Sequence, residues 1–207
     1  QIKFLEDIWE NEDRILVKNC GKLLVDKIFE IFSSSSSLIG VPLILKGLAE
    51  AYKHKINEKF EQEIKNLDIS KVYWKIINTF LDIMGSKFPK KPIDNQKKNM
   101  SPLQVHQFLA IRLLFDEKTA NSLGLTLNEK QWPSDEIARF GLIKYDKVGK
   151  FNFNHMTYAE FLISGFVFEL IEFYVTLPAA QLDFIFRILI KKKFQVVRMF
   201  LNLMLND

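Results

Sequence analysis

The chain has 207 residues, of which 48% are hydrophobic and 13% aromatic, with a formal net charge of +4 at pH 7. Its 19 Phe require a packed core, which excludes a largely disordered chain. A single cysteine excludes an internal disulfide, and 8 Gly with 6 Pro are too few for an all-β protein with many tight turns. This length allows one large domain or two small ones.

Several features predict a cytoplasmic protein without a membrane span. The N-terminal residues QIKFLEDIWENEDR are acidic where a signal peptide has an uninterrupted apolar run. The most apolar stretch, residues 161–177, contains Glu169 and Glu172, which are costly inside a bilayer. The lysines cluster within 87–98 and 191–193, which we interpret as a solvated loop and a solvated helix end. Nucleic-acid binding is therefore not the favoured interpretation.

The first half of the chain is expected to be helical. Apolar residues recur at spacings of three and four, and predict helices over residues 1–9, 20–32, 42–55 and 69–87. Five consecutive serines, Ser33 to Ser37, predict a loop, because serine competes with the helical backbone for hydrogen bonds. The stretch from 87 to 101 is rich in Pro, Lys and Asn, and marks the expected domain boundary.

The second half alternates helices with one hairpin. A helix is expected from Pro102, a short one near 134–140 with Ser134 as its N-cap, and a hairpin over 142–154, where apolar and polar residues alternate. Thr157 and Glu160 are spaced as a capping box, which predicts that a long helix begins near Met156. Two closing helices are expected over 179–192 and 194–205.

The expected fold class is mainly α, with a helical domain followed by a winged-helix domain that contains one short β-hairpin. The expected boundaries are 1–95 for the helical domain, 96–175 for the winged helix, and 176–207 for the start of a second helical domain.

The motifs of an independent enzyme are missing. The Gly-Lys pairs at 21–22 and 149–150 lack the earlier glycine and the following hydroxyl residue of a phosphate-binding loop. His54, His106 and His155 do not have the spacing of a metal site, and Cys20 lies in an apolar helical pattern typical of an inert thiol. We therefore predict no catalytic residue and no metal site.

Three stretches, in order, resemble the part of NACHT-type STAND ATPases that follows the nucleotide-binding core, most closely the large NACHT proteins of arthropods. Residues 1–52 contain FLEDIW and SLIGVPLILKGLAEAY, similar to the GxP element that opens the first helical domain. Residues 106–115, HQFLAIRLLF, are similar to the start of the winged-helix domain. Residues 151–168, FNFNHMTYAEFLISGFVF, resemble the signature at the end of that domain. Together they cover nearly the whole chain.

The resemblance implies a regulatory switch in an intracellular signalling or innate-defence protein. It implies that Pro42 packs against the adenine of ADP, and that His155 reaches the β-phosphate and holds the closed form. ADP and ATP would bind the intact parent protein, and the chain by itself would hold no cofactor, because the core with its phosphate loop is absent from these residues. The implied partners are that core, other signalling proteins, and further copies of the parent on activation.

Other interpretations of the same residues stay open. Pro42 suits the first turn of any helix, and His155 suits a surface or capping position. The chain can also be a stand-alone helical interaction module without a nucleotide. A winged-helix nucleic-acid binder is less favoured, because its recognition helix would carry Asp135 and Glu136 beside Arg139, and acids repel phosphates.

We expect the purified chain to have no ATPase or phosphatase activity, because it contains no phosphate loop and no paired catalytic groups. A coupled phosphate-release assay measures this directly. Turnover above the buffer rate that a point substitution within the chain abolishes would contradict the prediction.

Overall fold

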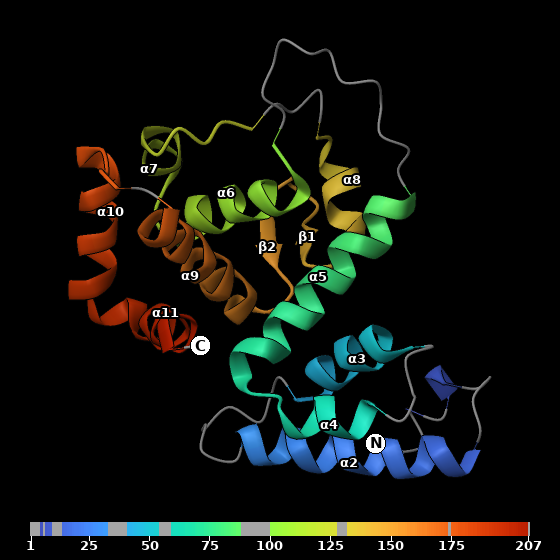
Figure 1. Cartoon of the computed structure of the whole chain (residues 1–207). Helices are drawn as coiled ribbons and strands as arrows, with labels where there is room; N and C mark the ends of the chain where they lie inside the picture. Colours follow the sequence, from blue (N-terminus) through green and yellow to red (C-terminus); the bar gives the residue numbers. More distant parts are fainter. Residues whose placement is uncertain are drawn as a thin grey trace. The chain divides into compact units, whose positions relative to one another are not determined.

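Figure 1 shows a computed structural model of the chain, which describes residues 5, 7–9, 14–32, 41–53, 59–87, 100–127, 132–173 and 175–206. The described part is mainly helical and contains one two-stranded antiparallel sheet, as the sequence predicted. It forms two compact units, residues 1–79 and 80–207. The predicted boundaries at 95 and 175 remain predictions, and residues 88–99 lie outside the described part.

In the described part of the first unit, the elements with defined bounds are all helices. These are α2 (Arg14–Phe32), α3 (Val41–Tyr52), α4 (Phe60–Lys65) and the beginning of α5 (Ile69–Lys87). The helices predicted at 20–32 and 69–87 are confirmed, although α2 begins earlier, and the helix predicted at 42–55 is confirmed as far as Tyr52. The helix predicted at 1–9 falls largely outside the described residues. The sequence analysis missed α4, a short helix in which only Phe60 and Ile64 are buried. The predicted serine loop lies outside the described residues.

Trp9 organises the core of the first unit. Its side chain is 2% exposed, and its indole Nε1–H donates to the carbonyl oxygen of Ala49 at 2.9 Å. Near the end of α3 the Lys53 amide donates to Glu50. The indole therefore supplies a hydrogen-bond donor to a carbonyl of the last helical turn that has no helical donor. Phe60 contacts Trp9 and Tyr52 edge to face, with ring centroids 6.1 and 5.0 Å apart.

The second unit surrounds one long helix, α9 (Met156–Phe173), which packs against α6 (Pro102–Leu114) and α11 (Gln195–Asn206). The other elements are α7 (Glu117–Ser122), α8 (Ser134–Arg139), β1 (Ile143–Tyr145), β2 (Phe151–Phe153), α10 (Ala179–Ile190) and the 3-10 turn η2 (Lys192–Phe194). The predicted helix from Pro102 and the two closing helices are confirmed.

An aromatic cluster attaches the last elements to this unit. The ring of Phe115 stacks on Phe194 at 4.5 Å and lies 4.8 Å from Phe184, which also contacts Phe166 edge to face. The guanidinium of Arg198 donates to two carbonyl oxygens at the end of α10, those of Ile188 and Lys191, at 2.7 and 2.8 Å. A cation at a helix C-terminus satisfies the last carbonyls and the helix dipole.

The predicted hairpin is confirmed. Its two strands pair Ile143 with Phe153 and Tyr145 with Phe151. The connecting turn is closed by the Asp146 carboxylate, whose Oδ1 accepts amide hydrogen bonds from Val148 at 3.0 Å and Lys150 at 2.9 Å. Gly149 has a φ of +79°, a conformation that glycine adopts without strain.

Two predicted caps are wrong. Pro133 is the N-cap of α8 and no side chain caps this helix, so Ser134 is its first residue rather than its cap. Helix α9 begins at Met156, as predicted, which places Thr157 inside the first turn instead of at an N-cap. A capping box that the sequence analysis missed opens α6, where the Ser101 hydroxyl and the Gln104 side chain each accept the other's backbone amide hydrogen bond. Among the described helices, none is long and apolar enough to cross a membrane.

Two helical glycines of the first unit, Gly47 and Gly21, differ in how closely their neighbours pack, so a pair of substitutions tests the packing of the core. A Cβ added at Gly47 would lie 2.9 Å from Cγ2 of the fully buried Ile76, whereas one at Gly21 would lie 3.3 Å from the terminal Cδ1 of Leu5. Alanine gains on the order of 1 kcal/mol of helix propensity at both sites, and overpacking a core costs roughly 1–3 kcal/mol.

We therefore expect Gly47→Ala to lower the free energy of unfolding by about 1 kcal/mol, and Gly21→Ala to leave it unchanged or to raise it. Urea unfolding followed by circular dichroism measures both variants. Equal effects of the two substitutions would contradict the packing of α3 on α5.

Candidate functional site

His155 lies between the hairpin and the first turn of α9. The preceding residue is held on both sides, because the Asn154 amide donates to the Leu142 carbonyl at 2.9 Å and its side-chain amide donates to the Gly141 carbonyl at 2.6 Å. The ring Nδ1 of His155 accepts a hydrogen bond from the Thr157 amide at 3.4 Å. His155 thus caps the first turn of the helix, where amides lack helical partners.

Partial burial sets the charge of this histidine. His155 is half-buried, and burial lowers the pKa of its imidazole below the ordinary value of 6.5. The ring is therefore neutral at pH 7, and since Nδ1 is an acceptor, the proton resides on Nε2. The neutral ring has one N–H that it can donate to an anion beside the positive end of the α9 dipole.

Pro42 is the second residue of α3, where a missing N–H costs nothing. Its side chain lies outside the described part, so its surroundings stay unassigned. Pro42 belongs to the first unit and His155 to the second.

His106 has a structural role that the sequence analysis missed. It is fully buried, its Nδ1–H donates to the Pro102 carbonyl at 2.7 Å, and its ring meets the Phe140 ring edge to face at 5.2 Å. Burial lowers its pKa to about 4. Its Nε2 is buried without a hydrogen-bond partner among the described residues. All of residues 105–111 are buried, including the polar His106 and Gln107, and no local sequence pattern indicated the burial of His106.

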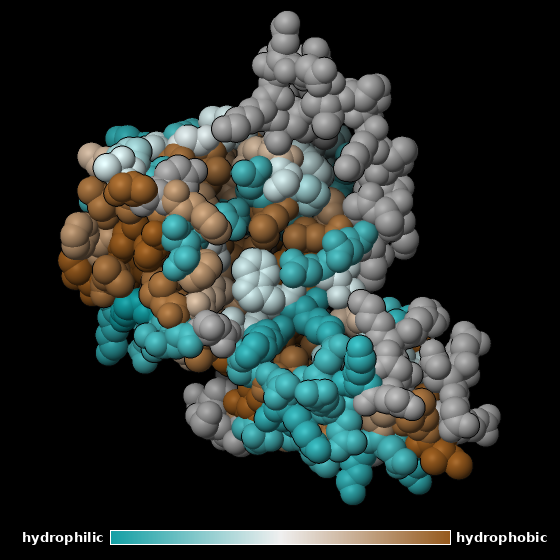
Figure 2. All heavy atoms as spheres, viewed as in Figure 1, coloured by the Kyte–Doolittle hydropathy of each residue, from teal (hydrophilic) through white to brown (hydrophobic). Residues whose placement is uncertain are grey.

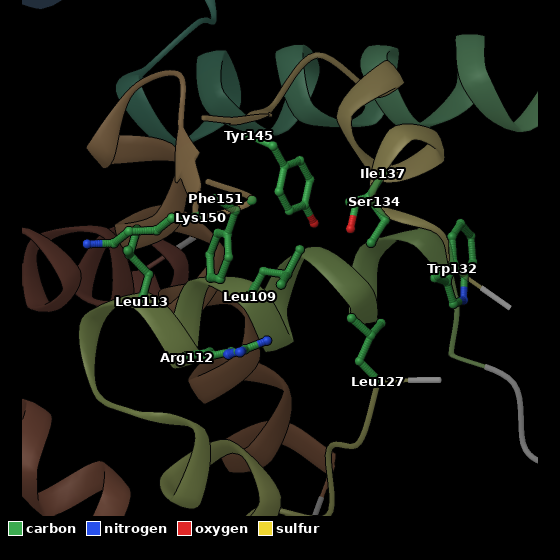
Figure 3. Close-up of a pocket in the computed structure, with 11 residues that line it drawn as sticks. Leu109, Arg112, Leu113, Leu127, Trp132, Ser134, Ile137, Tyr145, Lys150 and Phe151 are labelled. Carbon is green, nitrogen blue, oxygen red and sulfur yellow. The ribbon is translucent and has the colours of Figure 1, made fainter. Parts of the chain in front are cut away.

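The second unit also contains a pocket, formed by α6, α8 and the hairpin (Figure 3). Its volume is about 470 Å³. Most of the lining residues are apolar or aromatic, but polar atoms contribute more of the accessible lining than apolar atoms do. The lining residues are Leu109, Arg112, Leu113, Leu127, Trp132, Ser134, Ile137, Tyr145, Gly149, Lys150 and Phe151. Neither residue that the resemblance assigns to nucleotide binding lies in it. No sequence pattern indicated this pocket, because its walls come from α6, Leu127, the start of α8 and the hairpin, which only folding brings together.

Other reactive groups fit structural roles. Cys20 is half-buried, and burial is the main cause that raises the pKa of its thiol, which keeps it protonated and unreactive. Among the side chains that the structure describes, no three His, Cys, Asp or Glu residues are grouped to hold a metal ion.

Neither a protein-family model, nor a curated protein, nor a solved structure matches this chain. The resemblance to NACHT-type ATPases therefore depends on the three stretches quoted above, and it remains a hypothesis.

His106 makes the stability of the second unit depend on pH. Its pKa is about 4 in the folded protein and 6.5 when unfolded, so between these values the unfolded chain binds more protons. The stabilising contribution is fully present above pH 6.5 and is lost as the pH falls toward 4. The difference corresponds to on the order of 3 kcal/mol.

We expect His106→Leu to flatten the dependence of unfolding free energy on pH between 7 and 4, measured by urea titrations at several pH values. His155→Leu is the comparison, and it should flatten the curve less, because that ring is only half-buried. Parallel curves for wild type and His106→Leu would contradict the burial of His106.

Proposed function

We propose that this chain is the regulatory segment of a NACHT-type signalling ATPase, and that it closes over ADP bound to a nucleotide-binding core. The observation that carries the proposal is the placement of His155. A hairpin and the buried helix α9 hold its ring, and the bond from the Thr157 amide to Nδ1 leaves the Nε2–H as the donor. This is a suitable donor for a phosphate oxygen.

The order of elements supports a winged-helix domain in this segment. Helices α6, α7 and α8 are followed by the β1–β2 hairpin and then by α9. In this proposal the hairpin is the wing, and the chain leaves it through His155. The segment supplies a switch contact and no catalytic group, and hydrolysis belongs to the core.

The energetic role of His155 is modest but sufficient for a switch. The dipole of α9 favours an adjacent phosphate by on the order of 1 kcal/mol, and a hydrogen bond to a charged group adds roughly 1.5–3 kcal/mol. Because these contacts exist only in the closed form, they shift the equilibrium toward it. Exchange of ADP would remove them and allow contacts with other signalling proteins or with further copies, in the cytoplasm.

A second candidate function is a stand-alone helical interaction module, and one observation favours it. Helix α10 exposes an apolar row, whose members Leu182, Phe186, Leu189 and Ile190 are 42%, 57%, 47% and 77% exposed. Figure 2 shows apolar side chains gathered at the surface over this helix. Contiguous exposed apolar surface marks protein contacts. Nucleic-acid binding is less supported, because Asp135 lies 3.8 Å from Arg139 on the short helix α8.

Release of a fluorescent ADP analogue from the protein that carries this segment tests the proposal. We expect His155→Leu to accelerate release by at least about tenfold, which is the loss of one charge-assisted hydrogen bond. His155→Gln keeps a donor and should retain ADP better than the Leu variant. Lys147→Leu, an exposed change in the hairpin turn, should release ADP at the wild-type rate.

Comparable release rates for wild type and His155→Leu would exclude the phosphate contact. A full reading frame without a GxxxxGK[ST] motif before this segment would favour the interaction module. The melting temperature of the isolated chain is measured for each His155 variant as a control, because the half-buried His155 ring also contributes packing and its loss can destabilise the fold.

A further inference from the structure

We propose that the pocket between α6, α8 and the hairpin binds a small aromatic carboxylate. This inference is independent of the proposed nucleotide switch, because the pocket lies within the second unit and includes neither His155 nor Pro42. A volume of about 470 Å³ falls in the range of small-molecule sites and accommodates a two-ring compound.

Arg112 supplies the anion contact. Figure 3 shows its guanidinium below Leu109, between the side chains of Leu113 and Leu127. One nitrogen, Nη2, lies 3.1 Å from Oε2 of Glu117, and the described residues offer the remaining N–H groups no other acceptor. Among the described residues that line the pocket, none is acidic. The Glu117 carboxylate outside the lining is the negative charge with which an anion has to share the guanidinium.

The geometry favours a carboxylate over a phosphate. Glu117 already places a carboxylate oxygen against the guanidinium, and both partners of that pair are exposed, at 37% and 58% of their side-chain surface. An exposed ion pair contributes little stability, so a ligand carboxylate can replace or share it at low cost. A phosphate usually meets several converging donors, but the ammonium of Lys150 points away from the other lining side chains in Figure 3.

The body of the ligand is expected to be aromatic. Tyr145 and Phe151 are register partners on the hairpin, and their rings lie 6.3 Å apart with an interplanar angle of 59°. They form one wall, and the Arg112 guanidinium lies 5.7 Å from the Phe151 ring, so cation and ring are held together. Leu109 and Leu127 supply apolar contacts. A flat ring system fills such a wall with little loss of conformational entropy.

Two hydroxyls are placed to bond a polar substituent of the ligand. In Figure 3 the hydroxyls of Tyr145, from the hairpin, and Ser134, from α8, face each other, and both residues line the pocket. The indole Nε1 of Trp132 is buried and therefore offers the ligand no donor.

The test compares 2-naphthoate with its neutral analogue 2-naphthalenemethanol, by isothermal titration calorimetry on the full chain at low ionic strength. We expect 2-naphthoate to bind about tenfold tighter than the alcohol, and Arg112→Gln to remove this preference. Arg139→Gln is the matched control with the same charge change on α8, at a residue that does not line the pocket. It should change the affinity by less than about twofold.

Arg112→Lys keeps the charge without the planar fork, and should recover only part of the preference. Equal binding of the acid and the alcohol, equal losses in the two Gln variants, or no heat of binding with 2-naphthoate would overturn the proposal. Binding of a Glu-containing peptide in place of 2-naphthoate would overturn it too, since it would assign the pocket to a protein partner. Circular dichroism of each variant establishes that it is folded.

Discussion

The second unit depends on the burial of one helix on nearly all sides. Along α9 the residues from Phe161 to Val167 are all buried, so the helix needs neighbours around its whole circumference. Helices α6 and α11 supply them, with Phe161 and Phe200 in an edge-to-face contact at 5.1 Å. The fully buried Ser164 hydroxyl lies 2.8 Å from the Glu160 carbonyl and 2.9 Å from that of Val197. One polar contact is therefore satisfied inside an otherwise apolar interface, as burial requires.

This arrangement determines where polar groups are tolerated. Helix α6 faces α9 with the amide of Gln107, which donates to Glu169 at 3.4 Å, while burial raises the pKa of that Glu169 carboxyl. The neutral His106 on the same helix can be buried because its Nδ1–H donates a hydrogen bond to the Pro102 carbonyl. Six residues further along the helix, Arg112 reaches the pocket. The same helix thus carries the core on one side and the candidate carboxylate site on another.

The hairpin links the two candidate sites while keeping them apart. Its strand β2 begins with Phe151, whose ring lines the pocket, and ends with the buried Phe153, two residues before His155. Residues two apart on a strand are separated by roughly 6.6 Å and face the same side. The pairing of β2 with β1 and the hydrogen bond from the Asn154 side chain to the Gly141 carbonyl fix the register of the hairpin. A ligand in the pocket and an anion at His155 would therefore contact one rigid element at different points.

The sequence by itself determined the classes of elements and most of their order. The periods of apolar residues were sufficient for α5, α6 and the hairpin, because these patterns are local. They could not locate α4 or α7, where short helices with few buried residues have weak periods. The N-caps predicted at Ser134 and Thr157 were wrong, because the backbone geometry of a cap can occur at any of several neighbouring residues. Only the tertiary structure decided that His106 is fully buried, that His155 is half-buried and neutral, and that Arg112 meets Tyr145 and Phe151 around a pocket. Those properties depend on residues distant in the chain, whose packing sets solvation and charge.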